Sequence, residues 1–291
     1  MEVWAPVITP FRDDGGVDLD GYIENLHRLA RWGLTGALLC GSSGEFPHLT
    51  YEERREILVR SARERPQGFR LLAQAGGLPL PDVRRLVETA ADEGYEAALV
   101  ITPYYFVDET SPLGLKRYYD ELMKAGPVMI YHYPQQTGVD LSPQLVGDLA
   151  ASGVVGMKDT SGSAPFLAAV IAATPPSFRA YGGLGGSFLA ALTQGAKGGI
   201  LALSMLAPSQ CLELARLVGE GMIDEARTLQ SRLVPLARAV GVQHGIAGLK
   251  WAAGQVGLAS SAPRPPLLRL HADGRVHLAR LLEEIQSASA H

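Results

Sequence analysis

Cysteine and net charge are both scarce in this sequence, and each shortage excludes a class of protein. The 291 residues include only two cysteines, Cys40 and Cys211, which form neither a metal-binding pair nor a disulfide framework. Lysine and arginine total 26 against 30 acidic residues, a formal net charge of -4, so we expect no sequence-wide attraction to nucleic acid or to an anionic membrane. An anionic ligand would therefore have to be bound by local groups.

Long apolar runs are also absent. None approaches the roughly 20 residues that a membrane helix needs, and residues 1–10 lack the basic and then apolar pattern of a secretory signal. The composition is nevertheless 47% hydrophobic and only 19% charged, which supplies a large core and argues against disorder. We expect a globular, cytoplasmic protein with no membrane partner.

Short apolar runs typical of buried parallel strands recur along the chain. The eight predicted strands are Val3–Ile8, Gly36–Cys40, Arg70–Gln74, Ala97–Ile101, Val128–Tyr131, Val154–Met157, Phe178–Tyr181 and Gly199–Leu203. Segments with helical spacing lie between them, and their start signals include the capping box Thr50–Glu53 and prolines that follow Ser142 and Ala207. Eight strands alternating with helices in right-handed crossovers predict an α/β protein, a (β/α)8 TIM barrel that ends near Gly219.

A doubly wound sheet is the alternative fold, because it also alternates strands and helices. That fold usually has a glycine-rich phosphate turn after its first strand, whereas this sequence has Ile8-Thr9-Pro10-Phe11 there. The sequence therefore favours the barrel.

Helical spacing continues beyond the eighth unit. It extends over Ile223–Val240 and His244–Gln255, and Pro235 is expected to kink the first stretch. The sequence thus predicts a barrel over residues 1–220 and an appended C-terminal helical region over residues 221–291.

Lysine is scarce as well, and only one of the five lysines directly follows a predicted strand. The other four are Lys116 and Lys124 in a surface-type helix, Lys197 before the eighth strand, and Lys250 in the terminal helices. Lys158 closes the run Val154–Met157, so it would point into a mostly dry barrel mouth, where burial lowers the pKa of the amine. A neutral amine is a nucleophile that forms a Schiff base with a carbonyl substrate. The alternative is a structural ion pair with the adjacent Asp159.

Hydroxyl and glycine residues follow other strands. Tyr131 ends the fifth strand, close enough to Lys158 for its phenol to relay protons, and Tyr105 after the fourth strand could extend that relay. The structural alternative for a buried tyrosine is a hydrogen bond to the backbone. The amides and two hydroxyls of Gly41–Glu45 can bind a carboxylate, although most such loops are only turns. The four glycines within residues 182–186 could cradle a phosphate or only permit close backbone packing.

A metal site is a further possibility, because Glu45, His48, His132 and Asp159 all fall near strand ends. No two histidines are spaced i, i+4, however, and no cysteine cluster accompanies them. We therefore expect no metal and no cofactor.

Four motifs, in order and spacing, resemble the pyruvate-dependent class I aldolases related to dihydrodipicolinate synthase and N-acetylneuraminate lyase. They are Ala5–Phe11, Gly41–Glu45, Tyr131–Gly138 and Val155–Asp159, and the resemblance continues to the carboxyl terminus. It implies that Lys158 forms the Schiff base with pyruvate or another 2-oxo acid, and that Tyr131 is the phenol that transfers protons.

The resemblance implies further roles. Ser42 and Ser43 look like the two hydroxyl residues of the family's Gly-x-x-Gly-Glu loop, which together with Gly44 binds the 2-oxo carboxylate, and Ser42 joins the relay. Tyr105 is similar to the tyrosine that family tetramers donate across a subunit interface, which implies a homotetramer. Three more positions are similar to ones that contact substrate or face the lysine: Thr160, Gly182 and Ile200.

One position departs from the synthase pattern. Synthases have an arginine after the fifth strand that grips the carboxylate of the second substrate, and Gln136 stands there instead. A neutral amide holds a carboxylate less tightly than a guanidinium does. The segment from Gly41 to Thr50 and the late segment Gly245–Lys250 look instead like the 4-hydroxy-2-oxoglutarate aldolase branch, with Gln136 binding the distal end of the substrate.

The leading hypothesis is accordingly a lyase that cleaves a 4-hydroxy-2-oxo acid, such as 4-hydroxy-2-oxoglutarate, to pyruvate and an aldehyde. The alternatives are a dihydrodipicolinate synthase that condenses pyruvate with aspartate semialdehyde, and a 2-keto-3-deoxy sugar acid aldolase or dehydratase. A non-catalytic barrel that only senses a 2-oxo acid would need neither Lys158 nor Tyr131. The physiological substrate and the direction of the reaction stay open at this point.

Overall fold

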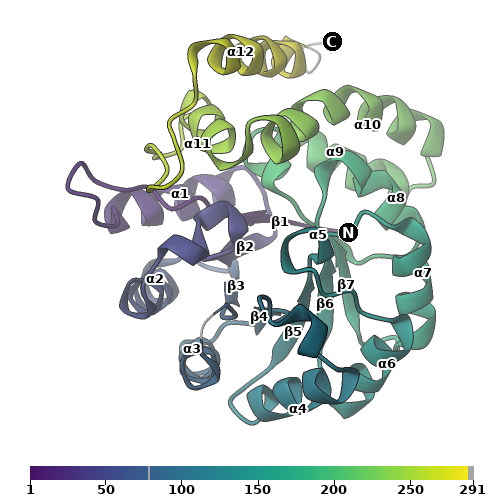
Figure 1. The fold of residues 1–291 in the computed structure, drawn as a ribbon. Coiled ribbons are helices and arrows are strands. Elements are labelled where there is room, and N and C mark those ends of the chain that lie inside the picture. Colours follow the sequence, from purple (N-terminus) through teal and green to yellow (C-terminus); the bar gives the residue numbers. More distant parts are fainter. Residues whose placement is uncertain (78, 288–291) are drawn as a thin grey trace.

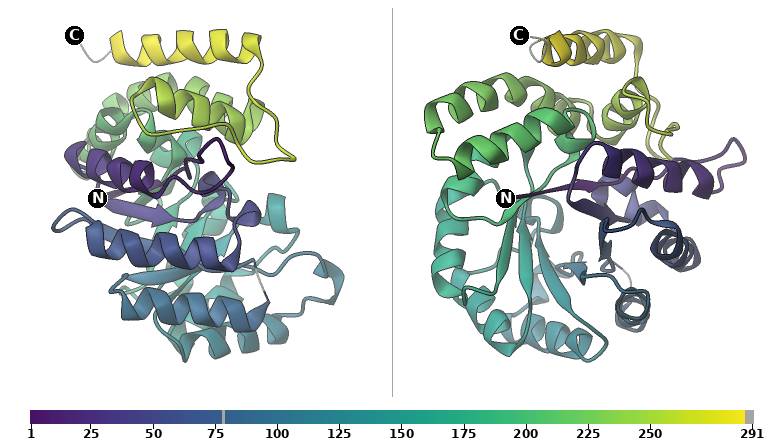
Figure 2. Two further views of the ribbon diagram at one scale, coloured as in Figure 1. Left: turned by 90° about the vertical axis from the view of Figure 1, so that its left-hand side faces the viewer. Right: turned by 180° about the vertical axis from the view of Figure 1, so that it is seen from behind.

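The strands of this chain close into a barrel. The computed structural model describes residues 1–77 and 79–287, and within them eight parallel strands pair in chain order, with β8 returning to β1. They are β1 (Glu2–Pro6), β2 (Gly36–Leu39), β3 (Arg70–Gln74), β4 (Ala97–Ile101), β5 (Val128–His132), β6 (Gly156–Asp159), β7 (Arg179–Gly182) and β8 (Gly198–Ile200). Helices surround them (Figures 1 and 2), so the predicted (β/α)8 barrel is confirmed.

The helices of the outer layer begin where the sequence signals them. They are α1 (Leu19–Arg31), α2 (Tyr51–Glu64), α3 (Leu80–Asp92), α4 (Pro112–Met123), α6 (Pro143–Ser152), α7 (Ala164–Ala173), α8 (Phe188–Thr193) and α9 (Pro208–Gly219). Thr50 caps α2 in the expected box: its Oγ1 accepts from the Glu53 amide at 3.2 Å, and its own amide donates to Glu53 Oε2 at 2.9 Å. Pro143 and Pro208 occupy first helical turns, as predicted.

Several strand boundaries differ from the predicted ones, because apolar runs mark burial rather than strand pairing. Only β3 and β4 match the prediction at both ends. Ile8 and Leu203 are buried, yet they lie beyond the last residues of β1 and β8. Lys158, by contrast, lies inside β6, with its Cα opposite Tyr131 of β5 and Tyr181 of β7. The candidate nucleophile is therefore a strand residue and not the first residue after a strand.

Side chains fill the interior of the barrel. The interior cluster contains Trp4, Leu38, Leu72, Leu99, Met129, Tyr131, Tyr181 and Ile200. At the amino-terminal end of the strands, Glu2 accepts hydrogen bonds from Tyr181 Oη at 2.6 Å and from Arg70 at 2.8 Å. This end is closed by packed and paired groups, so a site can form only at the carboxyl-terminal end of the strands, as in other barrels.

A C-terminal helical region follows the barrel. It comprises α10 (Ile223–Arg238), the π-helical turn η6 (Ala239–Gln243), α11 (Gly245–Gln255) and α12 (Ala272–Ser287). The predicted helix over Ile223–Val240 thus ends early at Arg238; Pro235 lies inside α10, and the π-helical turn begins shortly after it. Sequence analysis does not anticipate α12, which contacts α10 and α11 and lies on their outer side (Figure 1). The predicted domain boundary at residue 220 falls between α9 and α10 and stays a prediction, and residues 288–291 lie outside the described residues.

Two further observations bear on sequence expectations. Cys40 and Cys211 are both buried with free thiols, and burial raises the pKa of each thiol to about 12. Within the part of the chain that the structure describes, no helix combines the length and the apolar character needed to cross a membrane.

Candidate active site

Lys158 is a buried amine without a counter-charge. Its residue is 4% exposed, and burial lowers the pKa of the amine to about 7. Within residues 1–77 and 79–287, its Nζ makes no ion pair. It lies over the ring of Tyr131, 4.3 Å from the ring centre. An amine with this pKa is partly neutral near pH 7, so Lys158 can act as a nucleophile.

The alternative pairing of Lys158 with Asp159 is not present in the structure. Successive residues of a strand point to opposite faces, so the two side chains diverge. Asp159 instead contacts His132 Nδ1 at 2.9 Å and accepts from the amide and hydroxyl of Ser161 at 3.0 and 2.9 Å. The carboxylate that sequence analysis could place beside Lys158 is thus engaged behind the barrel wall.

Tyr131 is a protonated phenol beside the lysine. Its Oη lies 3.1 Å from Ser42 Oγ, so its partner is a hydroxyl and not the backbone. Burial raises the pKa of the phenol to about 12, although the hydrogen bond to Ser42 acts in the opposite direction. Tyr131 therefore holds its proton at neutral pH and can pass it along a hydroxyl chain to a group bound at Lys158.

The serine pair lies on a tight turn after β2. Ser42–Gly44 form the 3-10 turn η1, and Glu45 follows it in the left-handed region with φ 59° and ψ 38°. A Cβ at Gly44 would lie 2.9 Å from the Val7 carbonyl oxygen, so the turn needs glycine there. Thr9 Oγ1 donates to the Gly44 carbonyl at 2.7 Å and fixes the turn against the chain that leaves β1.

A cleft of about 810 Å³ opens over these groups at the carboxyl-terminal end of the strands. Six of the predicted site residues line it: Ser42, Ser43, Tyr131, Gln136, Lys158 and Thr160. The outer wall comes from η4 (Gly185–Ser187), η5 (Ala202–Met205), α10, η6 and α11, and is largely apolar apart from Arg238. The buried Thr160 side chain also lines this cleft, and its interaction with the Tyr131 phenol acts, like that of Ser42, to lower the pKa of the phenol.

The structure does not place the other predicted site residues in the lining of the cleft. Gly44 and Gly182 do not line the cleft. Gly183, the neighbour of Gly182, does, and a Cβ at Gly183 would collide with Thr160 Oγ1. Ile200 is fully buried in the barrel interior with Tyr131. These positions support the site from behind.

Tyr105 does not line this chain's own cleft. The side chain is 85% exposed, and its backbone has φ 89°, a left-handed conformation that is strained for an aromatic residue. Phe106 beside it is 66% exposed and stacks edge-on against it at 5.0 Å between ring centres. In this position, the Tyr105 side chain does not contribute to the cleft of its own chain.

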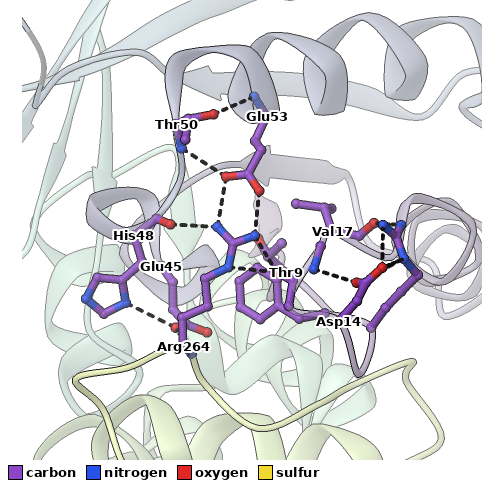
Figure 3. Close-up of polar contacts among 12 residues, drawn as sticks. Thr9, Asp14, Val17, Glu45, His48, Thr50, Glu53 and Arg264 are labelled. Atoms are coloured by element: carbon purple, nitrogen blue, oxygen red, sulfur yellow. Dashed lines mark hydrogen bonds and ion pairs between the residues drawn. The ribbon is translucent and has the colours of Figure 1, made fainter.

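The four residues considered for a metal site fall into two separate networks. Glu45 contacts Lys250, and it also contacts His48, as Figure 3 shows. His132 lies between Asp159 and Asp140. Within the described ranges, no three histidine, cysteine, aspartate or glutamate residues are grouped so that they could hold a metal ion.

Sequence analysis missed the role of Lys250. It places this lysine only in the terminal helices, whereas the structure buries it fully, with its Nζ donating to Glu45 Oε1 at 2.6 Å. The available signal was a single charge within the otherwise apolar stretch Gly245–Ala253 of α11. An isolated charge in an apolar helix indicates a buried partner, but the sequence does not say which one.

Comparisons with known proteins show the family to which this chain is similar. The chain matches the model of the dihydrodipicolinate synthetase family over residues 1–285. It is 30% identical to a 4-hydroxy-tetrahydrodipicolinate synthase of Methanothrix thermoacetophila, over 97% of this chain and 96% of that protein, and 31% identical to one of Methanopyrus kandleri, over 96% and 94%. Among solved structures it resembles a prophage protein of the dihydrodipicolinic acid synthase family from E. coli K12 in complex with pyruvate, with a TM-score of 0.91 and 28% identity over 98% of both chains.

Proposed function

We propose that Lys158 forms a Schiff base with pyruvate, because this chain belongs to the dihydrodipicolinate synthetase family and is a carbon-carbon lyase of its pyruvate-dependent aldolase type. The observation that carries this proposal is the burial of Lys158 without a counter-charge, beside the Tyr131 and Ser42 hydroxyls. Lys250 is also buried, but it is engaged by Glu45 and is no candidate nucleophile.

The reaction follows from the positions of these groups. The 2-oxo carboxylate binds the hydroxyls and amides of the Ser42–Gly44 turn, and Lys158 Nζ attacks the ketone carbon. Water leaves as the Schiff base forms, with Tyr131 supplying and recovering the proton through Ser42. In the condensation direction, the methyl carbon of the pyruvate Schiff base loses a proton to the Tyr131–Ser42 relay, and the enamine so formed attacks the aldehyde carbon. In the cleavage direction, the Schiff base of a 4-hydroxy-2-oxo acid loses its 4-hydroxyl proton to that relay as the carbon-carbon bond breaks, which releases the aldehyde and leaves the same enamine to be reprotonated and hydrolysed to pyruvate. Thr160, Gln136 and the backbone near Gly182 and Ile200 are proposed to complete the substrate contacts.

Borohydride trapping tests the covalent step. Pyruvate and borohydride should fix one adduct per chain, peptide mapping should find it on Lys158, and Lys158→Arg should abolish it because a guanidinium stays protonated. Lys197→Arg is the matched control, since Lys197 precedes β8 and should not affect trapping. An adduct on another lysine, or none, would refute the mechanism.

The second substrate separates two activities. The relatives named above are 4-hydroxy-tetrahydrodipicolinate synthases, which favours condensation with aspartate semialdehyde, while nothing in the comparisons specifically supports the 4-hydroxy-2-oxoglutarate aldolase branch. Gln136 is the observation that favours cleavage of a 4-hydroxy-2-oxo acid, because it lines the cleft where the synthase pattern has an arginine. We propose the synthase as the first candidate activity and the aldolase as the second.

Comparing kcat/KM for the two reactions on one preparation decides between them. A charged bidentate contact is worth about 1.5 to 3 kcal/mol. Gln136→Arg should therefore raise kcat/KM for aspartate semialdehyde by tenfold or more if the native chain lacks a substitute for that contact. Efficient native condensation with no gain from the arginine establishes the synthase. Poor native condensation with efficient cleavage establishes the aldolase.

A homotetramer is the proposed assembly, in which each subunit donates Tyr105 to a neighbour's site. The exposed side chains of Tyr105 and Phe106 and the strained backbone at Tyr105 support it. Light scattering combined with activity measurements tests this proposal. An active monomer would remove Tyr105 from the catalytic group.

A further inference from the structure

A buried ion pair joins the C-terminal region to the turn of the candidate active site. Lys250 Nζ of α11 donates to Glu45 Oε1 at 2.6 Å, and both side chains are fully buried. Burying two charges is a poor source of stability, because the loss of hydration opposes their attraction. Such a pair therefore calls for an explanation other than fold stability.

The carboxylate of Glu45 is held on both oxygens. Oε2 accepts from the Arg264 amide at 2.9 Å and contacts His48 Nδ1 at 3.3 Å, as Figure 3 shows for His48. Lys250 is itself fixed by the Ala262 carbonyl at 3.2 Å and by the ring of Phe11, whose centre is 4.1 Å from Nζ. These contacts hold the Glu45 side chain in a single conformation.

The backbone of Glu45 explains why that position matters. Its left-handed conformation terminates the Ser42–Gly44 turn, and this conformation is unfavourable for a residue with a Cβ unless the surroundings hold it. Ser43 and Ser42 lie two and three residues before it, and Ser42 Oγ must stay 3.1 Å from Tyr131 Oη. A shift of the Glu45 side chain would therefore turn the serine hydroxyls away from the cleft.

We propose that Lys250 is a positioning residue for the reaction: through Glu45, it fixes the Ser42–Ser43 hydroxyls in the geometry that binds the carboxylate of the 2-oxo acid. This inference rests on the proposed role of that turn. It gives the C-terminal helical region a direct function in substrate binding, although Lys250 itself does not line the cleft.

The double variant Glu45→Gln/Lys250→Met tests the proposal, because it removes both charges and leaves neither one buried alone. We expect a melting temperature close to that of the native protein. The KM for pyruvate should rise by about tenfold or more, since small displacements of binding groups are costly, and kcat should fall as well because Ser42 belongs to the proton relay of Tyr131. A native KM in a folded double variant overturns the proposal.

Arg264→Met is the matched control. The Arg264 side chain anchors the same C-terminal segment through Glu53, at 2.8 Å to Oε2, and through the His48 carbonyl at 2.7 Å, but only its backbone amide touches Glu45 (Figure 3). This variant should melt earlier and keep a KM for pyruvate close to the native value. An equal rise in KM would show that any loosening of the segment has the same effect, which contradicts a specific role for Lys250.

Two further measurements keep the outcome clear. If the double variant does not fold, Glu45→Gln alone replaces it, because the amide keeps the size of the side chain and a buried lysine can lose its proton. It should also raise the KM, and an unchanged KM counts against the proposal. Borohydride trapping on the native protein is run alongside: failure there refutes the Schiff base itself, whereas native trapping with unchanged variant KM values refutes only the positioning role.

Discussion

Two buried lysines in this chain show how one side chain takes opposite chemical roles. Lys158 lies in β6 at the floor of the cleft, and Lys250 lies in α11 where the C-terminal region meets the barrel. Burial lowers the pKa of both amines, but only Lys250 has a carboxylate, that of Glu45, to oppose this effect. Lys158 has no such partner, and its pKa falls to about 7.

The difference teaches that burial makes a lysine reactive only where the fold withholds a counter-charge. The strand geometry of β6 turns Asp159 to the other face, toward His132, and leaves aromatic side chains around Lys158. The αL residue Glu45, in contrast, delivers its carboxylate directly to Lys250. Identical substitutions at the two lysines should therefore have opposite consequences.

The largest expected effect is on turnover. Lys158→Met should lower kcat by roughly 10⁴-fold or more, the scale of losing a covalent nucleophile, because no other amine lines the cleft. Lys250→Met should still form the borohydride-trapped adduct on Lys158 at saturating pyruvate. Steady-state kinetics and intact mass measurements on both variants check this. If kcat of Lys158→Met stayed within tenfold of the native value, Lys158 would not be the nucleophile, and the two lysines would not differ in catalytic role.

Stability should respond with opposite signs. Lys250→Met leaves Glu45 as a buried unpaired charge and should lower the free energy of unfolding by about 3–5 kcal/mol. Lys158→Met removes an amine whose pKa falls from 10.5 to about 7 on folding. At about 1.4 kcal/mol per pKa unit, this substitution should raise the free energy of unfolding by up to about 4 kcal/mol at pH 7. Urea denaturation at pH 7 measures both. Destabilisation of similar size at both sites would mean that the Lys158 amine is stabilised by its surroundings as the Lys250 amine is by Glu45.

The sequence specifies the barrel and the nucleophile because both depend on local patterns. Eight apolar runs suffice to predict eight strands, and Lys158 stands out as the one lysine directly after such a run. Strand ends are misplaced where buried residues such as Ile8 continue past the last paired residue. The Glu45–Lys250 pair joins residues 205 positions apart, so only the folded chain reveals it.

The exposure of Tyr105 is likewise a property that the sequence does not predict. A motif predicts its identity as a candidate catalytic residue, but the direction of the side chain depends on the conformation of the loop after β4. The family resemblance supplied Gly182 and Ile200 in the same way, and the structure finds the neighbouring Gly183 in the lining. The family resemblance identifies positions along the chain, whereas the structure shows which residues line the cleft.

The two tyrosines that flank Lys158 sharpen the comparison on the active-site side. Tyr131 and Tyr181 both stand opposite Lys158 in the sheet, but Tyr131 Oη contacts Ser42 while Tyr181 Oη donates to Glu2 at the closed end. Tyr131→Phe should lower kcat by about 100-fold, as expected for a lost general acid or base. Tyr181→Phe is the control and should keep turnover within a few-fold. Equal losses of kcat in the two variants would indicate that both tyrosines have a structural role in packing.

The smallest expected effect, the pH dependence of adduct formation, tests the pKa of Lys158 directly. Because the amine is the nucleophile and its pKa is about 7, the neutral fraction should rise about tenfold between pH 6 and pH 8 and then level off. The folded amine binds fewer protons than the unfolded one between about pH 7 and 10.5, so stability should also rise with pH across that window in the native chain and not in Lys158→Met. The phenol of Tyr131, with its pKa raised to about 12, should add no second transition below pH 10. Trapping rates at limiting pyruvate give the midpoint, and a midpoint near 10 would show that burial does not lower the pKa of Lys158.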